Sequence, residues 1–416
     1  MKPSRGMCAF AFAIALSALA GAGAQAQPPA AEKEMTPSGP VDGPIDLATA
    51  LKRFPLTESA RTARELVPNW TFPSRMVVIV DRPERTQWLQ AAMPAGVTVV
   101  GVPDNAAAMR EMGDANAFIL ANGDCGVARG RGTADMWKSA PKLEWLHSGA
   151  GGTDQCMAQT ALANGNILLT NSQKVKSDGL METAFGYIFA LARNLDVALD
   201  NQRRGSFDAV RATRPVRQLE GATMLIVGLG GAGTEIARVA HELGMTVIAT
   251  RASSHEGPAY VEYVGLSDEL PDLIGRADIV VIAAPLTPQT RGLFNSAMFS
   301  RMKRGAMLVD FTRAEIVVPD DLAAALKDGR VGSAGLFWAT NAPLPKNSPL
   351  WTAPNLILTS WSGAASGVAD RYAHGPAANP KAQRDDELRW LLVRENMRRF
   401  AAGEKMYSVV NIGRGY

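Results

Sequence analysis

A short glycine-rich stretch carries the clearest chemical signal in this chain of 416 residues. Gly228, Gly230 and Gly233 have G-x-G-x-x-G spacing in the sequence GLGGAG, which also contains Gly231 and Ala232. In such a turn one glycine permits the tight bend, one lets main-chain N–H groups approach a pyrophosphate, and one lets a helix pack closely on a strand. A helix that starts there presents unpaired N–H groups to phosphates. The spacing predicts a dinucleotide-binding loop, and a glycine-rich turn that binds nothing is the alternative.

The residues on either side of the loop predict a β-α-β unit around it. Residues 225–227 form an apolar run typical of a buried parallel strand. Residues 234–243 have helical periodicity that stops at Gly244, and residues 247–250 predict a second strand. A glycine motif placed between a strand and a helix is a much more specific signal than the motif alone.

The rest of the chain predicts two parallel sheets. Before the glycine loop, strands are expected at 76–80, 97–102, 117–121 and 143–146, alternating with helices at 83–92 and 106–112. A long helix at 177–201 precedes the loop, and strands at 279–283, 307–310, 335–338 and 356–359 follow it. Helices are expected at 320–327 and 387–402, and a loop at 363–380. The fold class is therefore α/β, with two Rossmann-like, doubly wound parallel-sheet domains.

The N-terminus has the pattern of an export signal. Lys2 and Arg5 precede an apolar run at 8–22, and residues 24–26 form an A-x-A cleavage site. We expect residues 1–26 to be a cleaved signal peptide and the mature chain to be exported, with a periplasmic location; an uncleaved anchor is the alternative. Residues 27–73 predict a Pro/Ala-rich lead-in, within which 45–66 has weak helical spacing and can pack onto the body.

Composition excludes several classes of partner. The net charge of +3 and the lack of basic runs with interleaved aromatic residues argue against nucleic acid. Since no segment after the signal approaches 18 unbroken apolar residues, we expect no membrane span in the mature chain. No metal site is expected. Cleavage would leave Cys125 and Cys156, which can either pair in an oxidising compartment or remain two buried thiols.

Several segments in order resemble the D-isomer-specific 2-hydroxyacid dehydrogenases, which are NAD(P)-dependent two-domain enzymes. The segments are GLGGAG, ADIVVIAAPLTPQTRGLFN, MKRGAMLVDFTRAEIV, LAAALKDGRVGSAGL and SPLWTAPNLILTS. The resemblance implies a substrate domain at 74–200 and 365–416, split by an NAD(P)-binding domain at 201–364. It also implies a homodimer formed through the nucleotide domain. Residues expected near the cofactor are Gly228, Gly230, Gly231, Ala232, Gly233, Arg251, Ser253, Pro285, Thr287 and Thr312.

The resemblance assigns the substrate to two groups. Arg313 stands where the family has the arginine that polarises the carbonyl and pairs with the carboxylate. The loop after His147 matches the family's loop whose N–H groups hold the carboxylate, with residues Ser148, Gly149, Ala150 and Gly151.

The family's acid–base pair is missing. Ala342 stands where the family has the glutamate of an E-P pair, and Trp361 stands where it has the proton-donating histidine of T-P-H. Phe337 likewise replaces a common aspartate. Neither alanine nor indole supplies a proton at neutral pH, and losing a general acid typically costs about 10²–10⁴ in rate. The other titratable candidates are His147, Lys176 and His374, for each of which a packing or surface role is the simpler interpretation.

Cofactor preference is set at the end of the second strand. NAD-users carry an acidic residue there to accept hydrogen bonds from the ribose 2′-OH, whereas this chain has Arg251 followed by Ser253. Arginine suits a 2′-phosphate, so NADP is favoured over NAD. An exposed strand-end charge without a binding role is the alternative.

Two functions remain open at this point. The first is an oxidoreductase that transfers a hydride between NAD(P)H and a small 2-oxo or 2-hydroxy acid. The second is a catalytically silent NAD(P)- or metabolite-binding protein on the same fold. A reaction that needs no proton donor, such as an isomerisation with a tightly held cofactor, is a further alternative.

Overall fold

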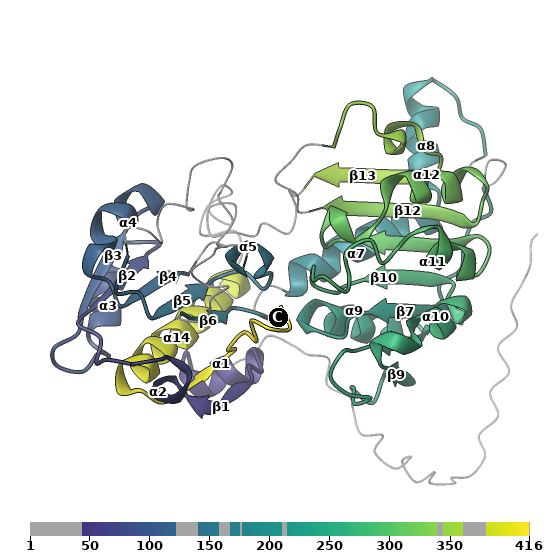
Figure 1. Ribbon diagram of the computed structural model, residues 1–416. Helices are drawn as coiled ribbons and strands as arrows, with labels where there is room; N and C mark the ends of the chain where they lie inside the picture. Colours follow the sequence, from purple (N-terminus) through teal and green to yellow (C-terminus); the bar gives the residue numbers. More distant parts are fainter. Residues whose placement is uncertain are drawn as a thin grey trace, which may run out of the picture. The chain divides into compact units, whose positions relative to one another are not determined.

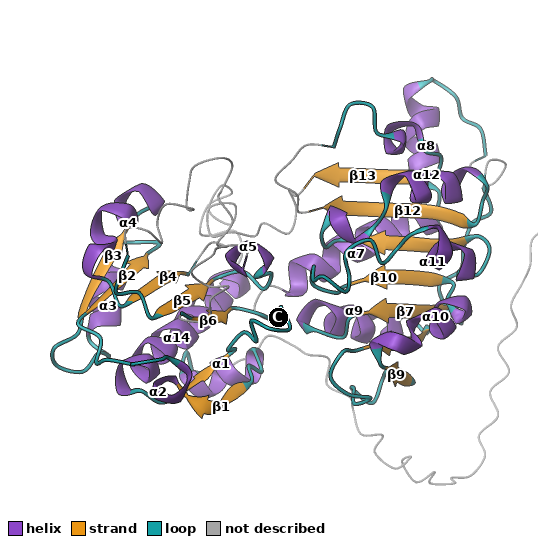
Figure 2. Ribbon diagram, in the orientation of Figure 1, coloured by secondary structure: helices purple, strands orange, loops and turns teal. Residues whose placement is uncertain are grey.

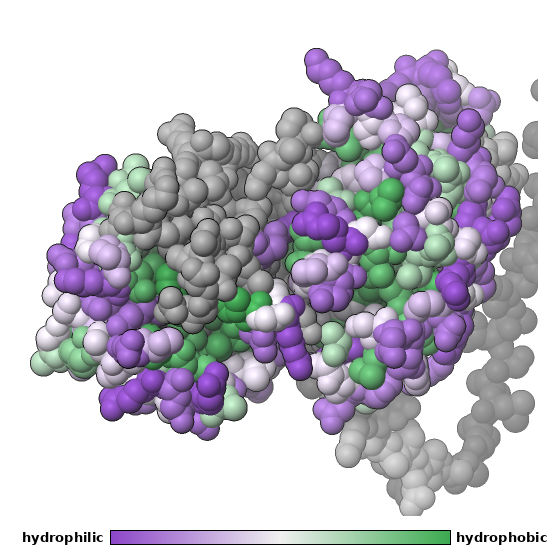
Figure 3. Space-filling model, viewed as in Figure 1, coloured by the Kyte–Doolittle hydropathy of each residue, from purple (hydrophilic) through white to green (hydrophobic). Residues whose placement is uncertain are grey.

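The computed structural model describes residues 44–121, 140–157, 167–174, 177–209, 214–338, 344–360 and 380–415. The expected signal peptide at 1–26 and the loop at 363–379 lie outside these residues. No helix among them is long and apolar enough to cross a membrane. On the face shown in Figure 3, hydrophilic residues cover much of the coloured surface, and smaller hydrophobic patches lie between them.

Seven parallel strands form the sheet of the domain that was predicted to bind a nucleotide, in the order β13-β12-β11-β10-β7-β8-β9 (Figures 1 and 2). They are β7 (Thr223–Val227), β8 (Thr246–Thr250), β9 (Tyr263–Gly265), β10 (Ile279–Ile282), β11 (Ala306–Asp310), β12 (Val331–Trp338) and β13 (Leu356–Ser360). The strands predicted here are confirmed. β12 starts before the predicted residue 335, because Gly332 interrupts the apolar run that marked the strand in the sequence. In the structure Gly332 packs closely against the backbone of Gly305.

Helices cover both faces of this sheet, as a doubly wound fold requires. Alternation along β7 sends Met224 and Ile226 to a core shared with α7 (Ser177–Ala192) and α9 (Gly231–Glu242). Leu225 and Val227 point to the opposite core. That second core is closed by α10 (Leu270–Leu273), α11 (Ser296–Arg301) and α12 (Pro319–Lys327).

The single helix predicted at 177–201 is wrong, because the structure has two helices there. Asn194 has a left-handed φ of 57° and separates α7 from α8 (Leu195–Arg203). Asparagine tolerates this conformation better than most residues. The Nε of Arg214 donates to Oδ1 of the buried Asn194 over 2.7 Å, which fixes the break from a distant part of the chain.

Five parallel strands form the second sheet, in the order β3-β2-β4-β5-β6, the 2-1-3-4-5 pattern of flavodoxin-like folds. They are β2 (Arg75–Ile79), β3 (Thr98–Val102), β4 (Ala117–Leu120), β5 (Trp145–Ser148) and β6 (Leu168–Asn171). The helices that belong to it are α3 (Glu84–Gln90), α4 (Asn105–Glu111) and α5 (Asp154–Met157). Two Rossmann-like parallel sheets, as predicted, are therefore confirmed.

The predicted lead-in at 27–73 is too long, since ordered structure begins well before residue 73. Helix α1 (Leu47–Arg53) buries Ala50 against Leu388 and Leu392 of α14 (Pro380–Ala402). This confirms the predicted packing of 45–66 onto the body. Two further elements, β1 (Glu58–Thr62) and α2 (Ala63–Leu66), follow α1. Strand β1 has no apolar alternation to reveal it, because its sequence is ESART.

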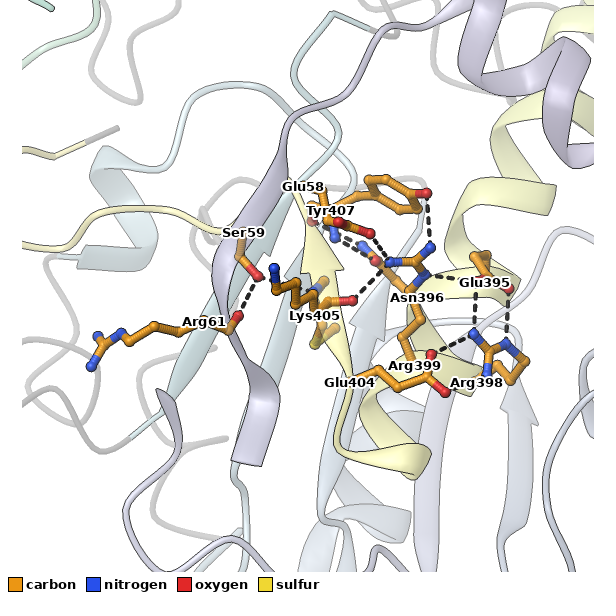
Figure 4. A network of polar contacts seen from close by, with 11 residues as sticks. Glu58, Ser59, Arg61, Glu395, Asn396, Arg398, Arg399, Glu404, Lys405 and Tyr407 are labelled. Carbon is orange, nitrogen blue, oxygen red and sulfur yellow. Dashed lines mark hydrogen bonds and ion pairs between the residues drawn. The ribbon is translucent and has the colours of Figure 1, made fainter. Parts of the chain in front are cut away.

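Strand β1 pairs antiparallel with β14 (Lys405–Tyr407), close to the C-terminus. Figure 4 shows the polar network over this pairing. Arg399 of α14 forms ion pairs with Glu58 and Glu395 and donates to the Tyr407 hydroxyl. Arg398 forms ion pairs with Glu395 and Glu404. The first described strand is thus fastened to the last strand and the last helix.

Candidate active site

The glycine loop directly follows β7, and each glycine meets a different need. Gly228 has a φ of +105° and lies so close to Ala283 that an added Cβ would stand 2.8 Å from the Ala283 carbonyl. At Gly233 an added Cβ would stand 2.1 Å from the Gly228 oxygen, so this glycine sets the contact between helix and turn. At Gly230, no described heavy atom beyond the residue and its two chain neighbours lies within 4 Å of an added Cβ. The loop thus has two glycines required by packing and one that faces open space.

The loop lies where the strand order reverses. β7 is flanked by β8 on one side and β10 on the other, so the chain leaves the middle of the sheet in both directions. In open α/β sheets, ligands bind beyond the carboxyl ends of the strands at this point. The N–H of Ala283 donates to Val227 over 2.8 Å and fixes the two strand ends side by side.

Helix α9 begins at Gly231, earlier than the predicted residue 234, because glycines carry no apolar periodicity. Its N-cap residue Gly230 provides no side-chain hydrogen bond, so the first-turn N–H groups are not capped by that residue. An uncapped helix start beside an open glycine suits a pyrophosphate. The residues present therefore fit a dinucleotide, with Gly230, Gly231 and Ala232 as the expected donors.

Arg251 lies immediately after β8, at the end of the strand where the ribose is expected. Its main-chain N–H donates to Gly265 over 2.9 Å, and its Nη1 donates to the Glu256 carbonyl over 3.0 Å. The side chain is thereby held within its own loop, with Ser253 exposed beside it. A guanidinium with a fixed direction and remaining donors is compatible with a 2′-phosphate.

The other predicted cofactor residues lie in two turns. Pro285 and Thr287 follow β10, and Thr290 donates its hydroxyl to the Pro285 carbonyl over 2.7 Å while bonding to Thr287. Thr312 follows β11, and both its N–H and its hydroxyl donate to Oδ1 of Asp310, over 2.9 and 2.6 Å. These hydroxyls have protein partners, so any contact with a cofactor has to be shared with those bonds.

The predicted carboxylate loop follows β5, but part of it is already engaged. The N–H of Gly149 donates to the Leu120 carbonyl over 2.8 Å, and the N–H of Ala150 donates to the Ser148 hydroxyl over 3.3 Å. The Asn171 amide donates to the carbonyl of Gly151 over 3.0 Å. Within the described part of the chain, the N–H groups of Gly151 and Gly152 have no protein acceptor. Of the predicted residues 148–151, those at the start of the loop therefore have N–H groups already in use. The N–H donors expected for a carboxylate are those of Gly151 and Gly152, at the end of the loop.

Arg313 makes a contact that the sequence did not predict. It follows β11, and its Nε and Nη2 donate to the two carboxylate oxygens of Asp154, over 3.1 and 2.9 Å. Asp154 begins α5, just after the carboxylate loop, and both side chains are more than four-fifths buried. The two residues are 159 positions apart, so no local pattern could have linked them.

A buried carboxylate, also missed by the sequence analysis, lies three residues before Arg313. Asp310 is fully buried, and burial raises its pKa to about 6 although hydrogen bonds from Thr312 and Trp338 favour the charged form. The indole Nε1 of Trp338 donates to Oδ2 of Asp310 over 2.7 Å. Phe337, which replaces the family's aspartate, is buried in the core instead.

His147 is not placed to serve as a proton donor. Its ring is buried, with Nδ1 2.8 Å from the Thr170 hydroxyl and Nε2 3.1 Å from the Ser172 hydroxyl. Burial, with a smaller contribution from the charge of Arg389, lowers its pKa to about 3. Lys176, His374, Ala342 and Trp361 lie outside the described residues.

Cys156 is fully buried and disulfide-bonded, which excludes the free-thiol alternative for this residue. Cys125, the partner considered above, lies outside the described residues. Cys156 packs in the same core as Leu146 of β5 and Leu169 of β6, and it belongs to the helix that begins at Asp154. The residue that pairs with Arg313 is thus on a covalently anchored turn.

Comparison with known proteins agrees with this geometry. Residues 185–363 match the NAD binding domain of the D-isomer specific 2-hydroxyacid dehydrogenases. A D-3-phosphoglycerate dehydrogenase of Methanocaldococcus jannaschii is 27% identical over 304 residues, which are 73% of this chain and 53% of that protein. A glyoxylate reductase of Korarchaeum cryptofilum is 32% identical over 240 residues, which are 56% of this chain and 70% of that protein.

The fold has solved counterparts as well. A D-isomer specific 2-hydroxyacid dehydrogenase family protein of Aeromonas salmonicida superposes with a TM-score of 0.62 at 25% identity, covering 82% of this chain and 99% of that one. The chain spans only about half the length of the phosphoglycerate dehydrogenase but most of the glyoxylate reductase. It belongs to the D-isomer specific 2-hydroxyacid dehydrogenase family of NAD(P)-dependent oxidoreductases that act on CH–OH donors.

Proposed function

We propose that this chain transfers a hydride between NAD(P)H and a small 2-oxo or 2-hydroxy acid. The observation that carries the proposal is the glycine loop at the strand-order reversal, with Gly230 facing open space before an uncapped helix. Arg313 at the end of β11, in the same sheet, supplies a donor for the substrate carbonyl. A bound nicotinamide would supply the hydride.

The first test is direct. Mass spectrometry of the protein as purified is expected to detect NADP or NAD, and NADPH oxidation is expected with at least one of pyruvate, glyoxylate or hydroxypyruvate. Failure of both nucleotides to bind in fluorescence titrations would refute the proposal.

Different residues of the chain would bind the carbonyl and the carboxylate of the substrate. Arg313 would polarise the carbonyl through its N–H groups, and the N–H groups of Gly151 and Gly152 would hold the carboxylate. His147 is not placed to donate the proton, because both of its ring nitrogens are bonded to hydroxyls.

That observation supports a second candidate, a catalytically silent protein that binds NAD(P) or a metabolite on the same fold. Ala342 and Trp361 in place of the acid–base pair favour it as well. The two candidates differ in one measurement. A silent protein binds NADPH but oxidises none with any 2-oxo acid, whereas the enzyme oxidises NADPH at a rate that disappears in Arg313→Gln.

We infer that the preferred cofactor is NADP, from Arg251 at the end of β8. A forked guanidinium recognises a phosphate better than a ribose hydroxyl. NADPH should bind more tightly than NADH, and Arg251→Asp should narrow or reverse the difference. Equal dissociation constants of the wild-type protein for the two nucleotides would contradict this inference.

We propose a homodimer formed through the nucleotide-binding domain. Supporting it, Phe189 of α7 and Leu195 and Leu199 of α8 are about half exposed, and Phe207 is fully exposed. Leu195 and Leu199 are one helical turn apart on α8, and exposed apolar side chains so placed are typical of interfaces. Sedimentation should give a dimer that Leu195→Glu with Leu199→Glu dissociates, and a wild-type monomer would refute the proposal.

We propose that the mature chain is exported to the periplasm after cleavage behind Ala26. The basic start, apolar run and A-x-A site of residues 1–26 support this. N-terminal sequencing of protein from a periplasmic fraction should begin at Gln27. An intact Met1 on protein from the cytoplasmic fraction would contradict it.

A further inference from the structure

The pairing of Arg313 with Asp154 is side-on. Nε donates to Oδ2 over 3.1 Å and Nη2 to Oδ1 over 2.9 Å, so one edge of the guanidinium faces both carboxylate oxygens. This is the forked geometry that makes arginine a good carboxylate receptor. A substrate carboxylate approaching the same edge would therefore have to displace Asp154.

The contact is well enclosed. The side chains of Arg313 and Asp154 are 14% and 18% exposed, so water screens the pair less than it would at the surface. The turn that carries Asp154 is anchored by the disulfide-bonded and fully buried Cys156. A Cβ at Gly152 would stand 2.6 Å from Nη2 of Arg313, so the loop also restricts this edge sterically.

The opposite part of the guanidinium remains available. Arginine has five N–H donors, and two of them are used by Asp154. Within the described residues, Nη1 of Arg313 has no protein partner. A single oxygen, such as that of a carbonyl, can be bound there without disturbing Asp154.

The local charge also disfavours an anion. Asp154 cancels the charge of Arg313, and the buried Asp310 three residues earlier contributes a second carboxylate. With a pKa of about 6, Asp310 is mostly ionised at pH 7. Arg313 is thus not an uncompensated cation awaiting a carboxylate.

We propose that Asp154 determines substrate class by occupying the forked edge of Arg313, which leaves this arginine to bind one carbonyl oxygen rather than a carboxylate. Resting on the proposed function, this deepens it: 2-oxo compounds with a neutral group beside the carbonyl, such as amides and esters, are bound about as well as 2-oxo acids. The side chain of Asp154 thus lowers the selectivity for 2-oxo acids over their neutral counterparts.

The test uses binding, so that it does not depend on turnover. Oxamate is an unreactive anionic analogue of a 2-oxo acid, and oxamide is its neutral counterpart. Their dissociation constants are measured by calorimetry on the full chain, with and without NADPH. The wild-type protein should bind the two within about threefold of each other. Asp154→Asn keeps the shape but removes the charge, and it should bind oxamate about tenfold or more tightly while oxamide changes little.

Asp196→Asn is the matched control. Asp196 also makes a two-bond contact with a partly buried arginine, Arg214, but on α8 and with no link to Arg313. A comparable loss of stability without a change in oxamate affinity is expected there. Three outcomes would overturn the proposal: a wild-type preference for oxamate above tenfold, unchanged oxamate affinity in Asp154→Asn, or no oxamate binding by either protein. Absence of NADPH oxidation would instead count against the proposed function alone.

Discussion

The two loops that follow β7 and β5 have similar glycine content but opposite surroundings. In the loop after β7, Gly228 and Gly233 are required by close backbone contacts, while Gly230 faces open space at the start of α9. In the loop after β5, an added Cβ at Gly149 would stand 2.2 Å from the Ala121 oxygen, and one at Gly152 would meet Arg313. The first loop is a site left open for a ligand, whereas the second is largely filled by the protein.

The difference between the loops shows that a chain can keep the sequence motif of a binding loop without keeping the open site. The first loop keeps the residue pattern of its family together with the open geometry. The second keeps the pattern, but its donors and its arginine are engaged by Leu120, Ser148 and Asp154. Binding of the nucleotide is thus better supported than binding of an ordinary 2-oxo acid.

The largest effect that would sharpen this comparison comes from restoring the acid–base pair. Trp361→His with Ala342→Glu should raise kcat/KM with NADPH and 2-oxo acids by about 10²–10⁴, the usual contribution of a general acid. Each single change should do much less, because the glutamate acts through the histidine. Wild-type activity already at about 10⁴ M⁻¹s⁻¹, the low end for ordinary enzymes, would mean that another residue donates the proton.

The next largest effect concerns the pH dependence of stability, through the histidine that precedes the loop after β5. His147 precedes this loop, and its pKa falls from 6.5 to about 3 on burial. The unfolded chain therefore binds more protons between these values, so the stability that His147 contributes is present above pH 6.5 and is lost as pH falls through that window. Between pH 7 and pH 4.5 the loss is about 2.5 kcal/mol.

Urea unfolding at these two pH values measures it. His147→Gln removes the titrating group, so the stability of this variant should fall less on acidification than that of the wild-type protein. His241→Gln, at an exposed histidine, is the control and should follow the wild-type protein. Parallel pH dependence of all three proteins would mean that the buried His147 does not stay neutral in the folded protein as described above.

The smallest effect tests the open loop. Gly230→Ala adds a methyl group where no described atom lies within 4 Å, so the melting temperature should stay within about 2 °C while NADPH affinity falls roughly tenfold. Gly233→Ala, which meets the Gly228 oxygen, should lower both. If Gly230→Ala leaves NADPH affinity intact, the loop is a structural turn and the contrast between the two loops disappears.

The features that the sequence predicted are those fixed by residues close to one another in the sequence. Both parallel sheets were predictable because buried strands such as β7 and β10 are continuous apolar runs. Strand β1 was not, since its pairing with β14 depends on residues more than 340 positions away. The break at Asn194 was missed because no local glycine or proline marks it; the side chain of Arg214, 20 positions later, fixes it instead.

The same distinction applies to the site: residues fixed by sequence neighbours were predicted, and those fixed by distant residues were not. The contact of Gly233 is with Gly228 in the same β-α-β unit, so spacing sufficed to predict its role, whereas Gly228 packs against Ala283 after β10. The state of Arg313 is set by Asp154 from the other sheet, and the carboxylate of Asp310 is held partly by Trp338 from another strand. Neither contact has a signature in one sequence. For His147 the sequence favoured a packing role over proton donation, and its partners Thr170 and Ser172 at the end of β6 agree with that interpretation.

The β1–β14 pairing has a consequence for how the chain is made. Glu58 lies opposite Tyr407, so the last strand to leave the ribosome completes a domain whose first strand was made early. Met406 and Phe400 fill the same core as Met76, which leaves that core open until these late residues have been made. Pairing over such a sequence separation is slow. The five-stranded domain would therefore complete its core only after β14 has been made, whereas all strands of the seven-stranded sheet lie earlier in the chain.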